Sequence, residues 1–194
     1  HFLIADNDIS GVRLSGVRLA GTNRGDIIGN TASSPAVLSF GTGGFSISTF
    51  AGGTIRDNIA TESSFWGFFV TTFDGGTIDG NTSKDSLLFD GYRIGQFNGG
   101  SFTNNTARGH TGFVTADGIE IVELNGGIVS GNTAIGNRRD GIIIGTMNAG
   151  TVESNTANDN GDDGFDLGGF RAPGQFNDKV ANNNGDAGFE VDDE

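Results

Sequence analysis

Glycine and asparagine recur along this chain at a fixed separation, and that repeat limits the possible folds more than any other feature. Each of six glycines is followed by an asparagine 14 residues later, as in Gly67 and Asn81 or Gly118 and Asn132. The distance from each asparagine to the next glycine is usually 9 residues, and longer where a repeat carries an insertion. A period of about 23 residues is too short for most paired-helix repeats and is typical of one coil of a strand solenoid. We therefore expect one domain over residues 1–194 with about eight coils.

The residues that follow each glycine alternate as in a β-strand. In one coil Phe68 and Val70 are two residues apart, and the other coils place apolar residues at the same positions. Glycine contributes 35 residues and no apolar helical face is visible, so helices are not expected. Glycine pairs such as Gly75-Gly76 predict corners. The fold expected is all-β, with equivalent side chains of successive parallel strands stacked about 4.8 Å apart over one continuous core.

The asparagine column predicts a ladder of side-chain amides along one corner. A stacked amide can donate a hydrogen bond to one neighbouring coil and accept one from the other. The residue two positions after each asparagine is small, which suits a tight inward corner. In the last coil Lys179 takes the asparagine position, and the ladder is expected to fray there. The predicted ladder residues are Asn30, Asn58, Asn81, Asn105, Asn132 and Asn155.

These columns resemble those of right-handed parallel β-helix repeat proteins, the pectin-lyase-like superfold, most clearly over residues 155–167 and 180–191. The resemblance covers nearly the whole chain and implies a right-handed β-helix that is extracellular or at the cell surface. It does not define an activity, because this superfold hosts lyases, hydrolases, epimerases, adhesins and phage fibres. No capping helix is evident at either end, which is consistent with a fragment of a longer array or with head-to-tail self-association.

Charge and composition exclude several classes of partner. The formal charge is −13, and residues 159–194 hold ten acidic residues against Arg171 and Lys179. Nucleic acid is therefore not expected as a partner. No apolar run is long enough to span a bilayer, and the absence of cysteine excludes disulfides.

Insertions fall on one arc of the coil, between asparagine and glycine, and they predict a ligand face on the loops 31–43, 59–66, 82–90 and 106–117. A tryptophan can stack on a sugar ring, while charged groups bond hydroxyls or carboxylates. This predicts a groove for a polysaccharide or a cell-surface glycan. The alternative is that the aromatic residues pack beneath the loops and the charges are solvated. The predicted ligand-binding residues are Phe65, Trp66, Lys84, Asp85, Arg108 and His110.

An enzyme is a weaker interpretation, and no catalytic residue is assigned. The resemblance implies that a polysaccharide lyase would use an arginine or lysine base, often beside a carboxylate-bound Ca²⁺. Arg108 with Lys84 and Asp85 is the cluster that fits this pattern, on the same face. The Asp-Pro-His signature of mannuronan epimerases is missing. Three functions thus remain open: a structural or carbohydrate-binding module, a lyase, and a filament subunit that stacks head to tail.

Asp-Gly recurs in four consecutive coils, as in Asp117-Gly118 and Asp140-Gly141. Stacked carboxylates about 5 Å apart repel by about 1 kcal/mol in water, and Ca²⁺ or the pair Arg138 and Arg139 would offset this. The alternative is that each aspartate accepts hydrogen bonds from turn amides and each following glycine supplies a positive φ. The Gly-Gly-x-Gly-x-Asp nonapeptide of calcium-binding β-rolls is absent. The candidate Ca²⁺ ligands are Asp140, Asp162, Asp163, Asp166 and Asp186.

Overall fold

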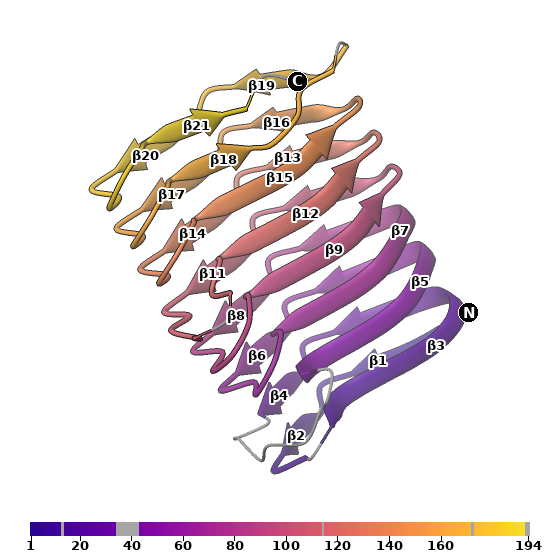
Figure 1. The fold of residues 1–194 in the computed structure, drawn as a ribbon. Helices are drawn as coiled ribbons and strands as arrows, with labels where there is room; N and C mark the ends of the chain where they lie inside the picture. The colour runs from indigo at the N-terminus through magenta and orange to yellow at the C-terminus, as the bar shows by residue number, and fades with distance from the viewer. Residues whose placement is uncertain (13, 34–42, 114, 172, 193–194) are drawn as a thin grey trace.

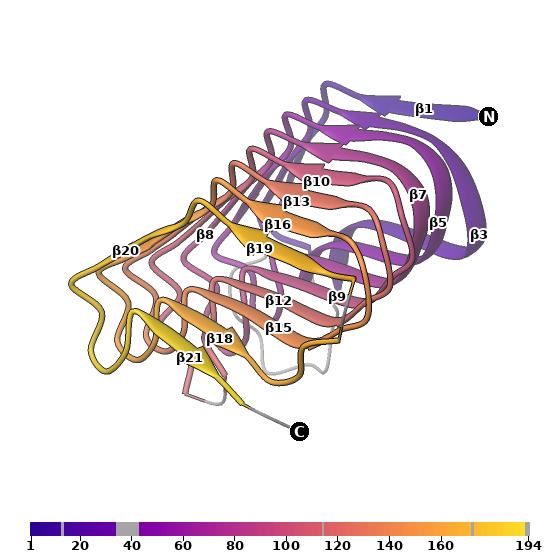
Figure 2. The ribbon, with the colours of Figure 1, turned by 90° about the horizontal axis from the view of Figure 1, so that it is seen from above.

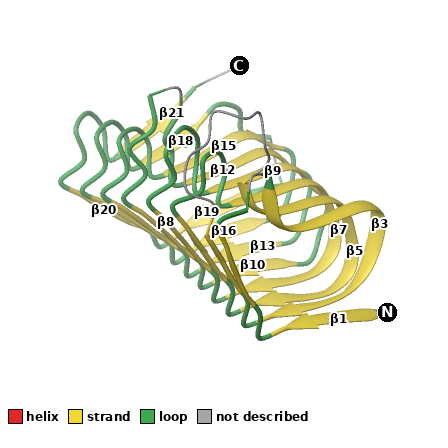
Figure 3. Cartoon of the chain, turned by 90° about the horizontal axis from the view of Figure 1, so that it is seen from below, coloured by secondary structure: helices red, strands yellow, loops and turns green. Residues whose placement is uncertain are grey.

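The computed structural model describes residues 1–12, 14–33, 43–113, 115–171 and 173–192, and these form a solenoid of parallel strands (Figure 1). Most of the predicted loop 31–43 lies outside the described residues. Seen from above, successive coils lie over one another and enclose a continuous interior (Figure 2). Strands and loops make up the described chain, with no helix among them (Figure 3). Accordingly, no described segment is a helix with the length and apolar character that a membrane span requires.

Among the described residues, one sheet contains 13 strands and wraps around a corner of the solenoid. In the first coils β3 (Ser15–Ile28), β5 (Gly43–Arg56) and β7 (Phe68–Asp79) run unbroken through this corner, whereas the short β1 (Phe2–Ala5) pairs with the last four residues of β3. The later coils divide at the corner into two arms. One arm is β9 (Tyr92–Phe97), β12 (Ile119–Leu124), β15 (Ile142–Met147), β18 (Phe165–Leu167) and β21 (Phe189–Val191). The other is β10 (Ser101–Thr103), β13 (Ile128–Ser130), β16 (Thr151–Glu153) and β19 (Gln175–Asn177).

The second sheet, over the part of the chain that the structure describes, has eight strands, one from each coil, which enclose seven full turns. They are β2 (Asp8–Ser10), β4 (Thr31–Ser33), β6 (Ile59–Thr61), β8 (Thr82–Lys84), β11 (Thr106–Arg108), β14 (Thr133–Ile135), β17 (Thr156–Asn158) and β20 (Val180–Asn182). All pairings of both sheets are parallel, for example between β8 and β11. The predicted all-β parallel solenoid is confirmed.

Equivalent side chains stack in register from coil to coil. Val70 pairs with Ile94, which pairs with Ile121, and all three are buried. An aromatic column runs beside them, with ring centroids 4.6 Å apart for Phe45 and Phe68. Each fully buried side chain of this kind contributes roughly 1.5–3 kcal/mol. The interior is therefore one core shared by all coils rather than a separate core for each coil.

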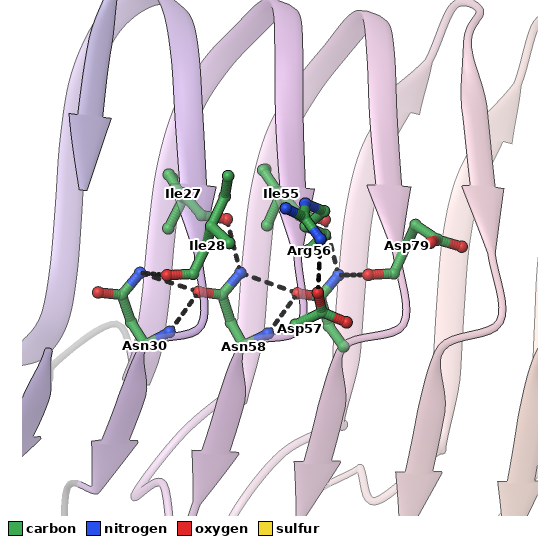
Figure 4. A network of polar contacts seen from close by, with 9 residues as sticks. Ile27, Ile28, Asn30, Ile55, Arg56, Asp57, Asn58 and Asp79 are labelled. Carbon is green, nitrogen blue, oxygen red and sulfur yellow. Dashed lines mark hydrogen bonds and ion pairs between the residues drawn. The ribbon is translucent and has the colours of Figure 1, made fainter. Parts of the chain in front are cut away.

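The asparagine column forms a continuous hydrogen-bonded ladder inside a corner (Figure 4). The Nδ2 of Asn58 donates to the Oδ1 of Asn81 at 2.9 Å, and Asn81 donates in the same way to Asn105 at 3.0 Å. Each Oδ1 also accepts from a backbone N–H, as between Asn30 and Asn58 at 2.9 Å. Successive ladder residues from Asn30 to Asn155 are 28, 23, 24, 27 and 23 positions apart, and the two longest intervals contain the insertions predicted from the sequence.

The glycine column is explained by space and not by backbone conformation. The glycines that follow the aspartates, such as Gly118 and Gly141, do not have a positive φ, contrary to the expectation for these turns. A Cβ on Gly118 would lie 2.7 Å from the Cβ of Ala134 and 2.6 Å from the carbonyl oxygen of Gly141. The backbone therefore approaches the neighbouring coil too closely for any side chain. Positive φ values occur at the predicted glycine-pair corner instead, as at Gly76 with 99°.

Candidate functional site

The loops that carry the predicted ligand residues stack along one corner, between the second sheet and the start of β7, β9 and β12 in the first sheet. Four half-buried aromatic rings gather there. Phe65 and Trp66 come from the bend before β7, and Phe89 from the equivalent bend one coil later. Phe69 points outward from β7 itself. The centroid of Trp66 lies 4.8 Å from that of Phe69 and 4.9 Å from that of Phe89, and Phe65 lies 5.3 Å from Phe89. We call these four residues the aromatic cluster.

A shallow groove of about 250 Å³ adjoins the aromatic cluster on the outer face of β3, β5 and β7. Its polar lining includes Arg18, Ser46 and Thr71, and Phe69 belongs to both the groove and the cluster. The outward column of this face reads Arg18, Ser46, Phe69 and Arg93 in successive coils. The groove forms because the small Ser46 stands between two larger side chains.

Three of the predicted ligand residues form a separate group on the second sheet. Arg108 on β11 pairs in register with Lys84 on β8, and Asp85 follows at the corner. Asp85 has a φ of 58°, and its Oδ1 would lie 2.8 Å from a Cβ on Gly109 in the next coil. Within the described chain, no hydrogen bond, ion pair or ring contact joins these residues to the aromatic cluster. The structure thus divides the predicted site into two groups.

His110 lies in the interior and not on the ligand face. It is 0% exposed, its Nδ1 accepts a hydrogen bond from the backbone N–H of Ser86 at 3.0 Å, and its own N–H donates to the Oδ1 of Asn137 at 3.3 Å. Burial lowers the pKa of His110 to about 3, so the ring is neutral. A glycan at the surface does not reach it in this conformation.

A second amide ladder accounts for the position of His110. Asn137 donates to Asn160 at 2.9 Å, and Asn160 donates to Asn184 at 3.1 Å. His110 takes the next place in this column, where its Nδ1 replaces the amide oxygen as acceptor. Sequence reasoning missed this ladder, although each member stands five residues after a residue of the first ladder column.

The aspartates that precede the glycines also form a column, in which each carboxylate accepts a backbone N–H from the next coil. Asp140 N–H donates to Asp117 at 3.1 Å, and Asp163 N–H donates to Asp140 at 2.8 Å. Burial raises the pKa of Asp90 and Asp140, and it raises that of Asp117 to about 7, to which the charge of Asp90 adds. Arg139 reaches both Asp117 and Asp140, at 3.9 and 4.0 Å.

Three of the five candidate Ca²⁺ ligands meet at this corner. Carboxylate oxygens of Asp140, Asp162 and Asp163 all lie within 4.8 Å of one another. Burial raises the pKa of Asp166, and the nearby charge of Asp140 raises it further. Asp186 stacks over Asp162, because its backbone N–H donates to the carbonyl oxygen of Asp162 at 3.1 Å. One oxygen each of Asp140 and Asp163 already accepts a backbone N–H, so the three offer about half of a Ca²⁺ shell of six to eight oxygens.

Arg138 does not offset this charge as expected. Its guanidinium lies 5.0 Å from the ring centroid of Phe113 and donates to the carbonyl oxygen of Gly112 at 3.2 Å. Arg139 alone of the two contacts the aspartate column.

The comparison with known protein families identifies the fold family. A family model described as a right handed beta helix region matches residues 43–194. The chain belongs to the right-handed beta helix family. A search of curated proteins and a search of solved structures found no match.

Several features converge on one band of this right-handed beta helix. Within the described residues, the buried side-chain polar atoms without a hydrogen-bond partner all fall between Ser63 and Thr115. The same coils carry the single tryptophan, the single tyrosine and all four residues of the aromatic cluster. Buried polar groups without partners are uncommon in folded proteins and require an explanation such as function or a bound water. This band, together with the adjoining groove, is therefore the candidate functional site.

Proposed function

We propose that this chain is an extracellular carbohydrate-binding module built on a right-handed beta helix. The observation that carries the proposal is the aromatic cluster, four half-buried rings in mutual contact on the outer face. Contiguous apolar surface of this kind marks interaction sites in soluble proteins. Ring faces pack against the apolar faces of sugars, while polar groups at their edges bond hydroxyls.

The groove beside the cluster favours a chain ligand over a small molecule. It is open, and Arg18, Ser46 and Thr71 provide a guanidinium and hydroxyl groups along one wall of the path toward Phe69. Successive coils place such groups about 4.8 Å apart along the solenoid axis. A polysaccharide lying along the axis would contact the groove first and the aromatic cluster next. The acidic composition is in keeping with the proposed extracellular location.

Binding to an array of polysaccharides, followed by calorimetry on each positive glycan, tests the proposal. Phe69→Ala removes the ring shared by groove and cluster and is expected to weaken binding roughly tenfold or more. Phe170→Ala is the control for removal of a phenylalanine ring from the surface, because Phe170 is 44% exposed and lies in a later coil. The proposal fails if the parent binds no polysaccharide, or if Phe69→Ala and Phe170→Ala retain the same affinity as the parent.

Lyase activity at Lys84 and Arg108 stays a prediction. The two side chains are neighbours in register and Asp85 is adjacent, but the groove lies against other strands. Incubation with pectate, alginate and chondroitin, with ultraviolet detection of an unsaturated product, tests it. Head-to-tail self-association also stays a prediction, and light scattering over a range of concentrations tests that.

A further inference from the structure

A fully buried carboxylate lies beneath the aromatic cluster. Asp90 is 0% exposed and stands one coil after Trp66, in the column that continues with Asp117, Asp140 and Asp163. Its Oδ1 accepts the backbone N–H of Asp117 at 3.2 Å. Its Oδ2, the indole Nε1 of Trp66 and the Oγ1 of Thr115 are all buried, and none of the three makes a hydrogen bond of standard geometry in the described chain.

These three atoms are complementary as donors and acceptors. An indole N–H only donates, a hydroxyl donates or accepts, and an ionised carboxylate only accepts. Burial raises the pKa of Asp90, while the side chains of Thr115 and Trp66 lower it, so both act on the carboxylate. A small adjustment or one bridging water completes the contact between carboxylate, hydroxyl and indole.

Few charged groups face Asp90. Arg93 on β9 lowers its pKa but is itself ion-paired with Glu120 on β12. Asp117 stands one coil further along the column, and the pKa of His110 is about 3, so His110 does not change charge near neutral pH. On the other side of Asp90 is the uncharged Trp66. The Thr115 hydroxyl and the indole N–H of Trp66 are therefore the uncharged donors beside the second carboxylate oxygen.

We propose that Asp90 is a positioning residue of the ligand face. Its carboxylate orients the indole of Trp66 through Nε1 and ties the bend that contains Thr115 to the same point. The functional consequence rests on the proposed carbohydrate binding, whereas the position of the indole can be measured without a ligand.

Fluorescence provides the measurement, because Trp66 is the single tryptophan of the chain. Asp90→Asn leaves one acceptor oxygen for two donors, so either the Asp117 N–H or the indole loses its partner. Asp117→Asn is the matched control, since Asp117 is also buried in the column but has no contact with Trp66. We expect Asp90→Asn to shift the emission to longer wavelength and to increase quenching by acrylamide, and Asp117→Asn to leave both unchanged. Identical behaviour of the two variants would overturn the proposal.

A pH profile separates positioning from simple packing. In the parent, the emission should change in one step as Asp90 ionises, above the ordinary carboxyl range, and Asp90→Asn should abolish that step while Asp117→Asn keeps it. Thermal unfolding verifies that each variant is folded. If Asp90→Asn does not fold, Thr115→Val removes only the hydroxyl and should produce a smaller shift of the same kind. An emission independent of pH in the parent contradicts the proposal.

Affinity distinguishes this inference from the proposed function. For a polysaccharide that the parent binds, Asp90→Asn should weaken binding roughly tenfold and Asp117→Asn should not. If no polysaccharide binds, carbohydrate binding fails while the emission measurements still decide the role of Asp90. If a polysaccharide binds and Asp90→Asn changes neither emission nor affinity, the positioning role alone fails.

Discussion

Asp117 illustrates how a side chain can serve the fold and still oppose its stability at neutral pH. Its Oδ1 accepts a backbone N–H at 3.1 Å, but burial, and next the charge of Asp90, raises its pKa to about 7. The folded protein therefore holds a proton that the unfolded chain releases near the ordinary value of 3.8. The contribution of Asp117 to stability is complete below about pH 4 and is lost as the pH rises to about 7.

Asp117→Asn should consequently stabilise the protein above neutral pH. An amide keeps the acceptor oxygen and removes the buried charge, as the asparagines of the second ladder do. At pH 8 we expect a gain on the order of 2 kcal/mol, equivalent to a melting temperature about 4–8 °C higher, and a smaller difference at pH 5. Thermal unfolding of parent and variant between pH 5 and pH 8 measures it. A lower melting temperature for the variant at pH 8 would mean that the attraction to Arg139 outweighs the cost of burial.

Several roles of single residues could not be predicted from the sequence, because they depend on the adjacent coil. The repeat shows that a glycine recurs, but the approach of Ala134 to Gly118 explains why. Phe65 and Trp66 were recognised as aromatic candidates, whereas Phe69 and Phe89 were missed. Phe89 stands 24 residues after Phe65, close to one coil, so the stacking of their rings follows from the period once the columns are aligned.

The sequence repeat predicts one of the asparagine ladders better than the others. The first ladder lies on the arc of constant length and was found directly. The second ladder follows the first on the arc that carries insertions. The number of residues from a second-ladder position to the next glycine therefore varies, and an alignment that starts from the glycines does not show this column. A third ladder, in which Asn98, Asn125 and Asn148 follow Asp74, lies at the surface beside the glycine-pair corner. Burial, which the sequence does not show, separates this third column from the first two, whose central members are buried.

Burial should decide how much each ladder contributes to stability. Asn105 is 0% exposed and exchanges hydrogen bonds with Asn81 and Asn132. Asn105→Ala leaves several buried groups without partners and should cost about 2–4 kcal/mol. Asn125→Ala removes two similar hydrogen bonds between side-chain amides at the surface. Water replaces these hydrogen bonds there, so the substitution should cost less than about 1 kcal/mol. Urea denaturation of both variants measures the difference, and equal losses would show that burial is not the deciding factor.

At the scale of the whole molecule, the corner that carries the candidate site changes character along the axis. From Gly67 onward, the column two residues before the glycines passes from aromatic residues to acidic ones: Phe65, Phe89, Ala116, Arg139, Asp162 and Asp186. Backbone hydrogen bonds show that the later members of this column stack. The N–H groups of Arg139, Asp162 and Asp186 donate to the carbonyl oxygens of Ala116, Arg139 and Asp162, respectively. The ligand face and the acidic cluster are therefore two ends of one continuous strip.

This gradient predicts a salt dependence that is concentrated in the later coils. Residues 159–194 contribute ten negative and two positive charges, or −8 of the total −13. Repulsion among exposed carboxylates is screened over a Debye length of about 8–10 Å at physiological ionic strength, so added salt should raise the melting temperature by a few degrees. Hydrogen exchange should show the gain in protection mainly after Asp159 and much less around Asn58.

Sodium and calcium chloride at matched ionic strength separate screening from a specific site. Screening alone gives the same shift in melting temperature for both salts, and this is the expected result, because the three carboxylates that meet at Asp140, Asp162 and Asp163 supply only part of a Ca²⁺ shell. A larger shift with calcium, abolished in Asp162→Asn but kept in Asp186→Asn, would contradict that expectation. It would show that the cluster completes its coordination with water or with further oxygens, and that the acidic end of the strip binds metal in its own right.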